Sequence, residues 1–209
     1  MPKSRLVVGM SGATGAIYGI RLLEVLQQVA EVETHLVVSS ATGKTVLQET
    51  PYALKEVEAL ATVTYRFGDI GAAIASGSFK TMGMVIIPCS MKTLSGVAHS
   101  FSDNLLLRAA DVALKDRRRL VLVTRETPLH LGHLRLMVQV TEMGGIIMPP
   151  MPAFYHRPQT LDDIINQTVN RVLDLFDIDL DYDLFERWAG MTHAAGRALA
   201  VDEKKNSVK

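Results

Sequence analysis

The stretch GMSGATGAIYGIRLL, residues 9–23, follows the apolar run Leu6–Val8 and predicts a buried strand, a tight turn and a helix. Gly12, Gly15 and Gly19 are spaced G-x-x-G-x-x-x-G, which differs from the dinucleotide-binding pattern G-x-G-x-x-G. Glycines allow the backbone to approach an anion closely, and a helix start offers free N–H donors. The turn therefore predicts a ligand site, although close packing of helix on strand explains the same glycines.

Apolar runs alternate with amphipathic segments along the rest of the chain. The runs expected to form strands are Leu6–Met10, His35–Ser39, Met84–Ile87 (ended by Pro88), Leu120–Thr124 and Ile146–Met148. The segments expected to form helices are Gly12–Gln28, about 41–49, Leu54–Leu60, Asn104–Lys115, Leu131–Met143 and Leu161–Phe176. This alternation predicts a three-layer α/β fold in which a parallel sheet has helices on both faces. We expect a single domain over residues 1–209, with a loosely held tail from about residue 194.

The composition narrows the class of protein. Of the 209 residues, 48% are hydrophobic, and the 22 Lys and Arg residues equal the 22 Asp and Glu residues in number. This balance indicates a globular protein with no bulk attraction for nucleic acid or an anionic membrane. Cys89 is the only cysteine, so no internal disulfide forms, and it is more typical of a small buried hydrophobe than of a nucleophile. We expect a cytoplasmic enzyme or binding protein, with no run approaching the roughly 20 apolar residues of a spanning helix.

Hydroxyl side chains follow two of the expected strands. Ser39 and Ser40 stand where a NAD site usually has an acidic residue for the ribose, so the pattern favours a mononucleotide, and FMN above others. Ser90 and Thr93 follow the strand that Pro88 ends. Their hydroxyls either cap the next helix or hold a cofactor oxygen.

Charged side chains supply a second set of candidates. Arg108 and Lys115 are seven residues apart, so they share a helix face with Asp111. The three residues form either an intrahelical ladder of ion pairs or a cationic site for phosphate. Four further candidates for a functional site are Arg125, Glu126, Tyr155 and Arg171. For each of them, the alternative to a functional role is an ordinary position on the surface. We expect no metal site, because His130 and His133 lack a nearby acidic or cysteine partner.

Five motifs occur in order: SGATGAIYG (11–19), SGS…PCS (76–90), RAADVALK (108–115), RETPLHLGHLRLM (125–137) and FYHRPQ (154–159). Together they resemble the UbiX-type flavin prenyltransferases of ubiquinone biosynthesis, over about residues 5–188. The resemblance implies a Rossmann-like or flavodoxin-like fold and a metal-independent reaction. That reaction joins the dimethylallyl group of dimethylallyl phosphate to N5 and C6 of reduced FMN. It also implies a homo-oligomer, a trimer or dodecamer with sites between subunits, whose prenylated FMN serves a partner decarboxylase.

The resemblance also implies roles for individual residues. FMN would be held by Gly12, Ala13, Thr14, Ser39, Ser90, Thr93 and Arg125. The substrate phosphate would be bound by a set that we call the phosphate clamp: Arg108 (lent by a neighbouring subunit), Lys115, Tyr155 and Arg171. Catalytic roles would fall to Glu49, Glu126 and Ser90.

Two alternatives stay open. A flavin-dependent decarboxylase of an aromatic acid or a cysteine-containing peptide would typically place a histidine near the start of the Pro-containing strand. This chain has the turn Ser76–Ser78 there, and its nearest histidine, His99, lies beyond the strand. A flavin-binding protein without catalysis would leave the phosphate clamp and Glu126 without a role.

Overall fold

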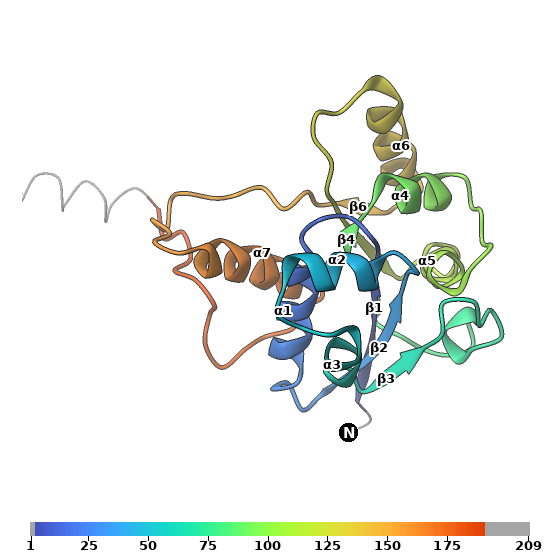
Figure 1. The fold of residues 1–209 in the computed structure, drawn as a ribbon, viewed down its shortest axis with the longest axis horizontal. Helices are drawn as coiled ribbons and strands as arrows, with labels where there is room; N and C mark the ends of the chain where they lie inside the picture. Colours follow the sequence, from blue (N-terminus) through green and yellow to red (C-terminus); the bar gives the residue numbers. More distant parts are fainter. Residues whose placement is uncertain (1–2, 191–209) are drawn as a thin grey trace, which may run out of the picture.

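The structure, a computed structural model, describes residues 3–190. It contains one six-stranded sheet in the order β3-β2-β1-β4-β5-β6, in which all neighbouring strands are parallel (Figure 1). The strands are β1 (Ser4–Met10), β2 (Val32–Val38), β3 (Val63–Tyr65), β4 (Gly83–Cys89), β5 (Arg119–Thr124) and β6 (Ile146–Ile147). The helices are α1 (Ala16–Leu26), α2 (Thr42–Glu49), α3 (Leu54–Ala59), α4 (Met91–Ala98), α5 (Leu105–Lys115), α6 (Leu131–Glu142) and α7 (Leu161–Leu175), with a 3₁₀ turn η1 (Ala73–Ala75).

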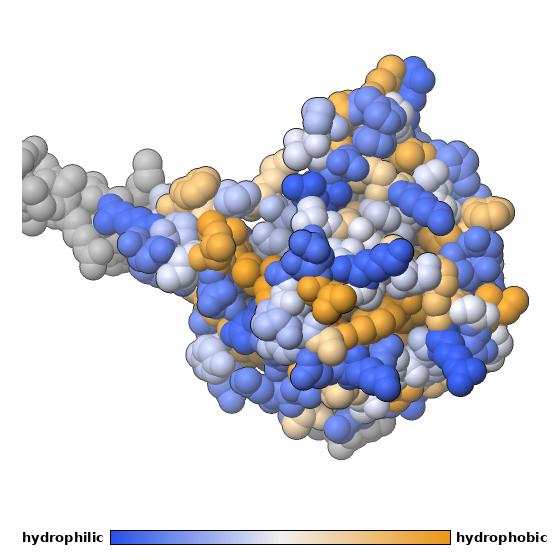
Figure 2. Space-filling model, viewed as in Figure 1, coloured by the Kyte–Doolittle hydropathy of each residue, from blue (hydrophilic) through white to orange (hydrophobic). Residues whose placement is uncertain are grey.

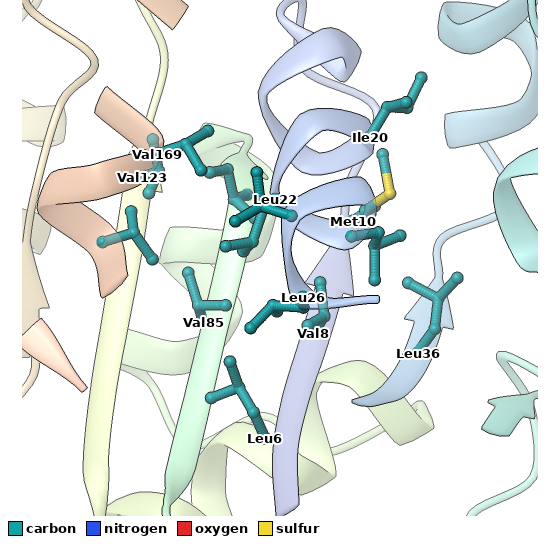
Figure 3. Close-up of a cluster of buried hydrophobic side chains, with 14 of the residues drawn as sticks. Leu6, Val8, Met10, Ile20, Leu22, Leu26, Leu36, Val85, Val123 and Val169 are labelled. Atoms are coloured by element: carbon teal, nitrogen blue, oxygen red, sulfur yellow. The ribbon is translucent and has the colours of Figure 1, made fainter. Parts of the chain in front are cut away.

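Helices cover both faces of this sheet, which confirms the predicted three-layer fold. Successive residues of a strand point to opposite faces, so Leu6 and Val8 of β1 pack in one core and Val7 packs in the other. The first core also contains side chains of α1 and α7, and Figure 3 shows Leu22 and Leu26 directed at the strands. The second core is formed with α4, α5 and α6. In Figure 1 these two groups of helices lie on opposite sides of the sheet.

The chain reverses its direction of winding between β1 and β4. β2 and β3 extend the sheet on one side of β1, and β5 and β6 extend it on the far side of β4. Ligands of doubly wound sheets bind at this switch point, beyond the carboxyl ends of the strands. The polar residues that follow β1, β2, β4 and β5 all lie at this edge.

Several predicted boundaries need correction. The helix expected from Gly12 begins only at Ala16, because Gly15 has a φ of 95° and precedes the first helical turn. Pro88 does not end β4, which continues to Cys89 through a register shift that turns Cys89 toward the second core. β3 is an additional element, α4 is the helix expected after Ser90, and the predicted tail from about residue 194 lies outside the described residues. Within residues 3–190, no helix combines the length and the apolar character needed to cross a membrane.

Candidate functional site

Ser11 joins the carboxyl ends of the two central strands. Its backbone N–H and its hydroxyl both donate to the Pro88 carbonyl, at 3.1 and 2.9 Å, and its Oγ accepts from the Ser90 N–H at 2.8 Å. Ser11 is only 2% exposed. Its hydroxyl is therefore engaged within the protein and is not offered to a ligand.

The start of α1 is already occupied by a carboxylate. Glu49, at the end of α2, accepts from the N–H groups of Gly15 at 2.8 Å and Ala16 at 3.1 Å. A carboxylate at this position is stabilised by the helix dipole. These donors are not free for an anionic ligand, contrary to the sequence prediction. The remaining turn residues Ala13 and Thr14 are half-buried and exposed, respectively.

A cavity of about 610 Å³ lies beside this turn at the carboxyl edge of the sheet. Of the residues predicted to hold FMN, four line it: Gly12, Ser39, Ser90 and Thr93. Its volume lies within the roughly 300–1,000 Å³ typical of pockets for ligands of drug size. The cavity is thus the place in the described chain where most of the predicted cofactor residues meet.

Side chains that sequence reasoning did not select complete the cavity. They come from the end of β2, the segment after β3, helix α4 and the segment into α5, and include Phe67, Lys92, Ser95, His99, Phe101, Asn104, Leu106 and Leu107. Part of this wall could have been predicted from the sequence, because the polar and aromatic run HSFSDN (99–104) leads into the predicted helix at Asn104.

The start of α4 faces the cavity with its positive end. Ser90 Oγ accepts from the Thr93 N–H at 3.3 Å and donates to Thr93 Oγ1 at 3.2 Å. Both interpretations of Ser90 are therefore compatible, because it caps α4 and lines the cavity. Lys92 adds a positive charge at the same helix start, so this end of the cavity favours an anionic group.

Close packing shapes the opposite wall. A Cβ on Gly12 would lie 2.5 Å from Ala41 Cβ, so any larger residue would displace the segment after β2. That segment is held by Thr42, whose hydroxyl donates to the Met10 carbonyl at 2.8 Å and lies 3.0 Å from Ser39 Oγ. Hydroxyls and a helix start on one side, with Leu and Phe side chains on the other, suit a ligand such as FMN, which carries a phosphate and a planar ring.

Arg125 and Glu126 lie at the same edge, after β5. The Arg125 N–H donates to the Cys89 carbonyl at 3.0 Å, which places this residue next to the end of β4. Glu126 Oε1 accepts from the Thr127 N–H at 3.0 Å. Both side chains are exposed, and neither lines the cavity.

Lys115 lies away from the cavity. It ends α5, about 12 Å along the helix from the cavity-lining Leu107 at 1.5 Å per residue. Its Nζ donates to Asp116 at 2.7 Å and would be 2.7 Å from a Cβ on Gly77, in the segment that leads into the amino end of β4. Lys115 therefore lies toward the amino edge of the sheet, opposite the cavity.

Arg108 is fixed by contacts within the chain. Its Nε donates to the Ala75 carbonyl at 3.1 Å and its Nη1 donates to Asp111 at 2.8 Å. The intrahelical ladder thus exists between Arg108 and Asp111, but Lys115 pairs with Asp116 instead of joining it.

Tyr155 and Arg171 lie on the side of α7. Arg171 Nη1 donates to Asp174 at 2.7 Å and borders a cavity of about 250 Å³ with Met148 and Met151. The Tyr155 ring packs edge-on against Trp188 at a centroid distance of 5.8 Å. Within residues 3–190, one chain therefore does not bring the phosphate clamp together, and none of its members lines the cavity.

Cys89 and the histidines have structural positions. Burial raises the pKa of the fully buried Cys89 thiol, which fits the small-hydrophobe interpretation. His130 Nδ1 accepts from the Gly132 N–H at the start of α6, and its ring lies 3.6 Å from that of His133. Among residues 3–190, no group of three or more His, Cys, Asp or Glu side chains is arranged to hold a metal.

Comparison with known proteins identifies the family of this chain. The family model described as Flavoprotein matches residues 1–173. Flavin prenyltransferase UbiX of Escherichia coli (strain K12) is 67% identical over 186 residues, which are 89% of this chain and 98% of that protein. A solved structure of AnUbiX (PadA1) in complex with FMN and dimethylallyl pyrophosphate is 50% identical, with a TM-score of 0.87, and the match covers 90% of this chain and 98% of that one.

A second solved structure is described as a dodecameric FMN-dependent UbiX-like decarboxylase from Escherichia coli O157:H7. It is 50% identical, with a TM-score of 0.86, and the match covers 89% of this chain and all of that one. Identity of this level over nearly the whole chain extends well beyond a shared fold. The chain belongs to the flavoprotein family and, within it, to the UbiX-type flavin prenyltransferases.

Proposed function

We propose that this protein is a flavin prenyltransferase that joins the dimethylallyl group of dimethylallyl phosphate to N5 and C6 of reduced FMN. The observation that carries the proposal is the cavity at the switch point, with hydroxyls and the start of α4 at one end and apolar walls at the other. The 50% identical AnUbiX (PadA1), whose complex contains FMN and dimethylallyl pyrophosphate, supports the choice of both ligands. The domain over residues 1–209 is then a single flavin-binding unit.

The cavity residues would bind and orient the flavin. Gly12, Ala13 and Thr14 would contact it through the turn after β1, and Ser39, Ser90 and Thr93 would offer hydroxyls from the other strand ends. Arg125 would contact it from the exposed end of β5. When bound, reduced FMN supplies the electron-rich N5 and C6 that accept the dimethylallyl group.

The cationic residues would take up the charge of the leaving phosphate. Guanidinium and ammonium groups stabilise such a charge without a metal, and the Tyr155 hydroxyl adds a donor. Glu126 would accept the proton that leaves C6, with Glu49 assisting from the start of α1 and Ser90 at the cavity. The apolar wall of Leu106 and Leu107 would exclude water, which would otherwise capture the allylic group.

A homo-oligomer is part of the proposal, because the phosphate clamp is incomplete at the cavity of a single chain. Lys115 lies toward the opposite edge of the sheet, so its access to a cavity requires another subunit. The surface supports association, since α6 presents Leu131, Leu134 and Val138 at 60, 45 and 57% exposure with the spacing of one helix face. Figure 2 shows apolar side chains reaching the surface at the projecting end of α6. We propose trimers or a dodecamer, and the dodecameric UbiX-like decarboxylase supports assembly into an oligomer.

The wider role follows from the same assignment. We propose that the prenylated FMN is passed to a prenyl-FMN-dependent decarboxylase in ubiquinone biosynthesis, in the cytoplasm. Direct decarboxylation by this chain is the less favoured alternative. The segment before β4 contains the hydrogen-bonded pair Ser76 and Ser78 and no histidine.

The test is anaerobic incubation of the protein with reduced FMN and dimethylallyl phosphate, followed by mass spectrometry of the flavin. A five-carbon adduct is expected. An unmodified flavin, together with release of CO₂ from an aromatic acid, would instead establish the decarboxylase.

Two variants extend this test to the phosphate clamp. Lys115→Ala and Arg171→Ala should reduce adduct formation by at least about 100-fold, since each removes a charge that stabilises the transition state, and should leave FMN affinity unchanged. Arg117→Ala is the matched control, because it removes a neighbouring exposed arginine that has no proposed role. Full activity in both clamp variants would contradict the assigned roles.

A further inference from the structure

A short segment near the end of the described chain is fastened to α7. We call residues 183–188 the strap. The Leu184 N–H donates to Asn170 Oδ1 at 2.9 Å. Arg187 contacts Asp183 at 2.7 Å and donates to both oxygens of Asp174, at 2.8 and 3.1 Å. The strap is therefore attached to α7 by three hydrogen bonds, one from the Leu184 backbone and two from the Arg187 guanidinium.

The carboxylate that receives Arg187 also holds Arg171. Asp174 Oδ2 accepts from Arg171 Nη1 at 2.7 Å and from Arg187 Nη1. The Asp174 side chain is 21% exposed and lies in the last turn of α7, where the helix dipole disfavours a negative charge. Burial alone would raise the pKa of Asp174, but the hydrogen bonds and charges of Arg187 and Arg171 outweigh it and hold this pKa below its ordinary value.

The same strap contacts the other clamp residue on this side. The rings of Phe185 and Trp188 pack edge-on against Tyr155, at centroid distances of 6.4 and 5.8 Å. Tyr155 is 45% exposed and lies in the segment between β6 and α7. Its position therefore depends on side chains whose backbone is fastened through Arg187.

The charge balance leaves Arg171 available to an anion. A guanidinium has five N–H donors, and within residues 3–190 Arg171 commits only Nη1 to a side chain. Arg187 donates to both oxygens of Asp174 and neutralises it, and Asn170 Nδ2 donates to Oδ1 at 3.2 Å. Without Arg187, the Asp174 carboxylate would keep only the neutral Asn170 amide besides Arg171, so its charge would favour a bidentate pair with Arg171.

We propose that Asp174 and Arg187 are positioning residues of the phosphate clamp. Asp174 orients Arg171, Arg187 prevents Asp174 from engaging Arg171 completely, and the strap attached to Arg187 holds Tyr155. This inference rests on the proposed function, because it concerns how that site binds the prenyl phosphate. It assigns a role to residues that touch neither substrate.

The experiment compares steady-state kinetics of FMN prenylation in four proteins: the unchanged chain, Arg187→Ala, Arg187→Lys and the double variant Arg187→Ala/Asp174→Asn. We expect Arg187→Ala to raise KM for dimethylallyl phosphate about 10-fold, with FMN affinity unchanged. The KM of Arg187→Lys should lie between those of the unchanged chain and Arg187→Ala, because lysine keeps the positive charge but cannot donate to both carboxylate oxygens as a planar guanidinium does. The double variant should recover about 3-fold of the loss in Arg187→Ala, because a neutral amide in place of the Asp174 carboxylate no longer competes for Arg171, whereas the part due to the unfastened strap at Tyr155 remains.

Arg119→Ala is the matched control for stability. Arg119 also bonds to an aspartate near the end of α7, Asp177 at 2.9 Å, and contacts no clamp residue. It should leave KM unchanged, and thermal unfolding of both variants measures how much stability each one loses. An unchanged KM in Arg187→Ala, or a double variant as impaired as that single variant, would overturn the positioning role alone. Absence of adduct with the unchanged protein would overturn the proposed function and this inference together.

Discussion

His35 is a buried histidine in the middle of β2, with 2% of its surface exposed. Its Nδ1 lies 2.9 Å from the Tyr65 hydroxyl, and its Nε2 lies 3.3 Å from Glu33 Oε1. Burial lowers the pKa of His35, the Glu33 carboxylate opposes this shift, and Arg5 adds to it. The net shift of the pKa is downward from 6.5, so folding favours the neutral form of the ring.

This shift makes the stability of the protein dependent on pH. Because the folded-state pKa is depressed, the unfolded chain binds the proton more readily once the pH falls below about 6.5. The contribution of His35 is thus complete above that pH and declines below it. Urea unfolding between about pH 7.5 and about pH 5.5 should show a steeper loss of stability for the unchanged chain than for His35→Gln. Equal slopes would contradict the assignment.

Hydroxyl residues show how far single-residue prediction reached. Ser39 and Ser90 were selected because they follow strands, and both line the cavity. Ser11 also follows a strand, yet its hydroxyl links β1 to β4. Sequence position gives the edge of the sheet on which a side chain lies. It does not give the rotamer, which depends on a carbonyl 77 residues away, that of Pro88.

Helix α1 is an element whose start depends on another element. Its first N–H groups are satisfied by Glu49 at the end of α2, and Gly15 provides the left-handed residue before it. Replacement of Glu49 by Gln should cost about 0.3–1 kcal/mol of stability, because the amide oxygen still accepts a hydrogen bond and only the charge is lost. Chemical denaturation measures this loss.

The same variant separates the structural role of Glu49 from its proposed catalytic role. If Glu49 assists proton transfer, Glu49→Gln should reduce the rate of prenylation far more than the small stability loss explains. Gln48→Glu, at the neighbouring exposed position, is the control for added or removed charge on α2. A rate equal to that of the unchanged chain would leave Glu49 with its capping role only.

The predicted boundaries of helices and strands are wrong where tertiary contacts override the local sequence pattern. β4 passes through Pro88 because its Pro88 carbonyl still pairs with Ser11, so the missing N–H does not end the strand. β3 has three half-exposed or exposed residues and no apolar run to reveal it. The long helices α5 and α7 were predicted within a residue, since their amphipathic patterns and their Asn104 and Thr160 caps agree.

At the scale of the whole molecule, the candidate site is divided among parts of the chain that do not meet. The cavity lies at the carboxyl edge, Lys115 lies toward the amino edge, and Arg171 lies with α7 on the other face. The family resemblance supplied these residues as a set. Their separation in one chain depends on the path of α5 and α7, which no local pattern reveals.

This division predicts complementation between inactive subunits. Ser40→Trp places a large side chain at the exposed rim of the cavity and should block FMN. Co-expressed with Lys115→Ala, it should restore about one quarter of normal activity, because a functional site then needs an intact cavity from one chain and Lys115 from its neighbour. Each variant expressed alone should be inactive. Absence of recovery in mixed oligomers would show that a chain uses its own Lys115.

The most direct test of the account is a crystal structure of the assembled protein with reduced FMN and dimethylallyl phosphate. The account predicts the flavin in the cavity of Gly12, Ser39, Ser90 and Thr93, with Lys115 of a neighbouring subunit at the phosphate of the second ligand. A flavin bound outside this cavity, or a phosphate distant from Lys115 in every subunit, would contradict it.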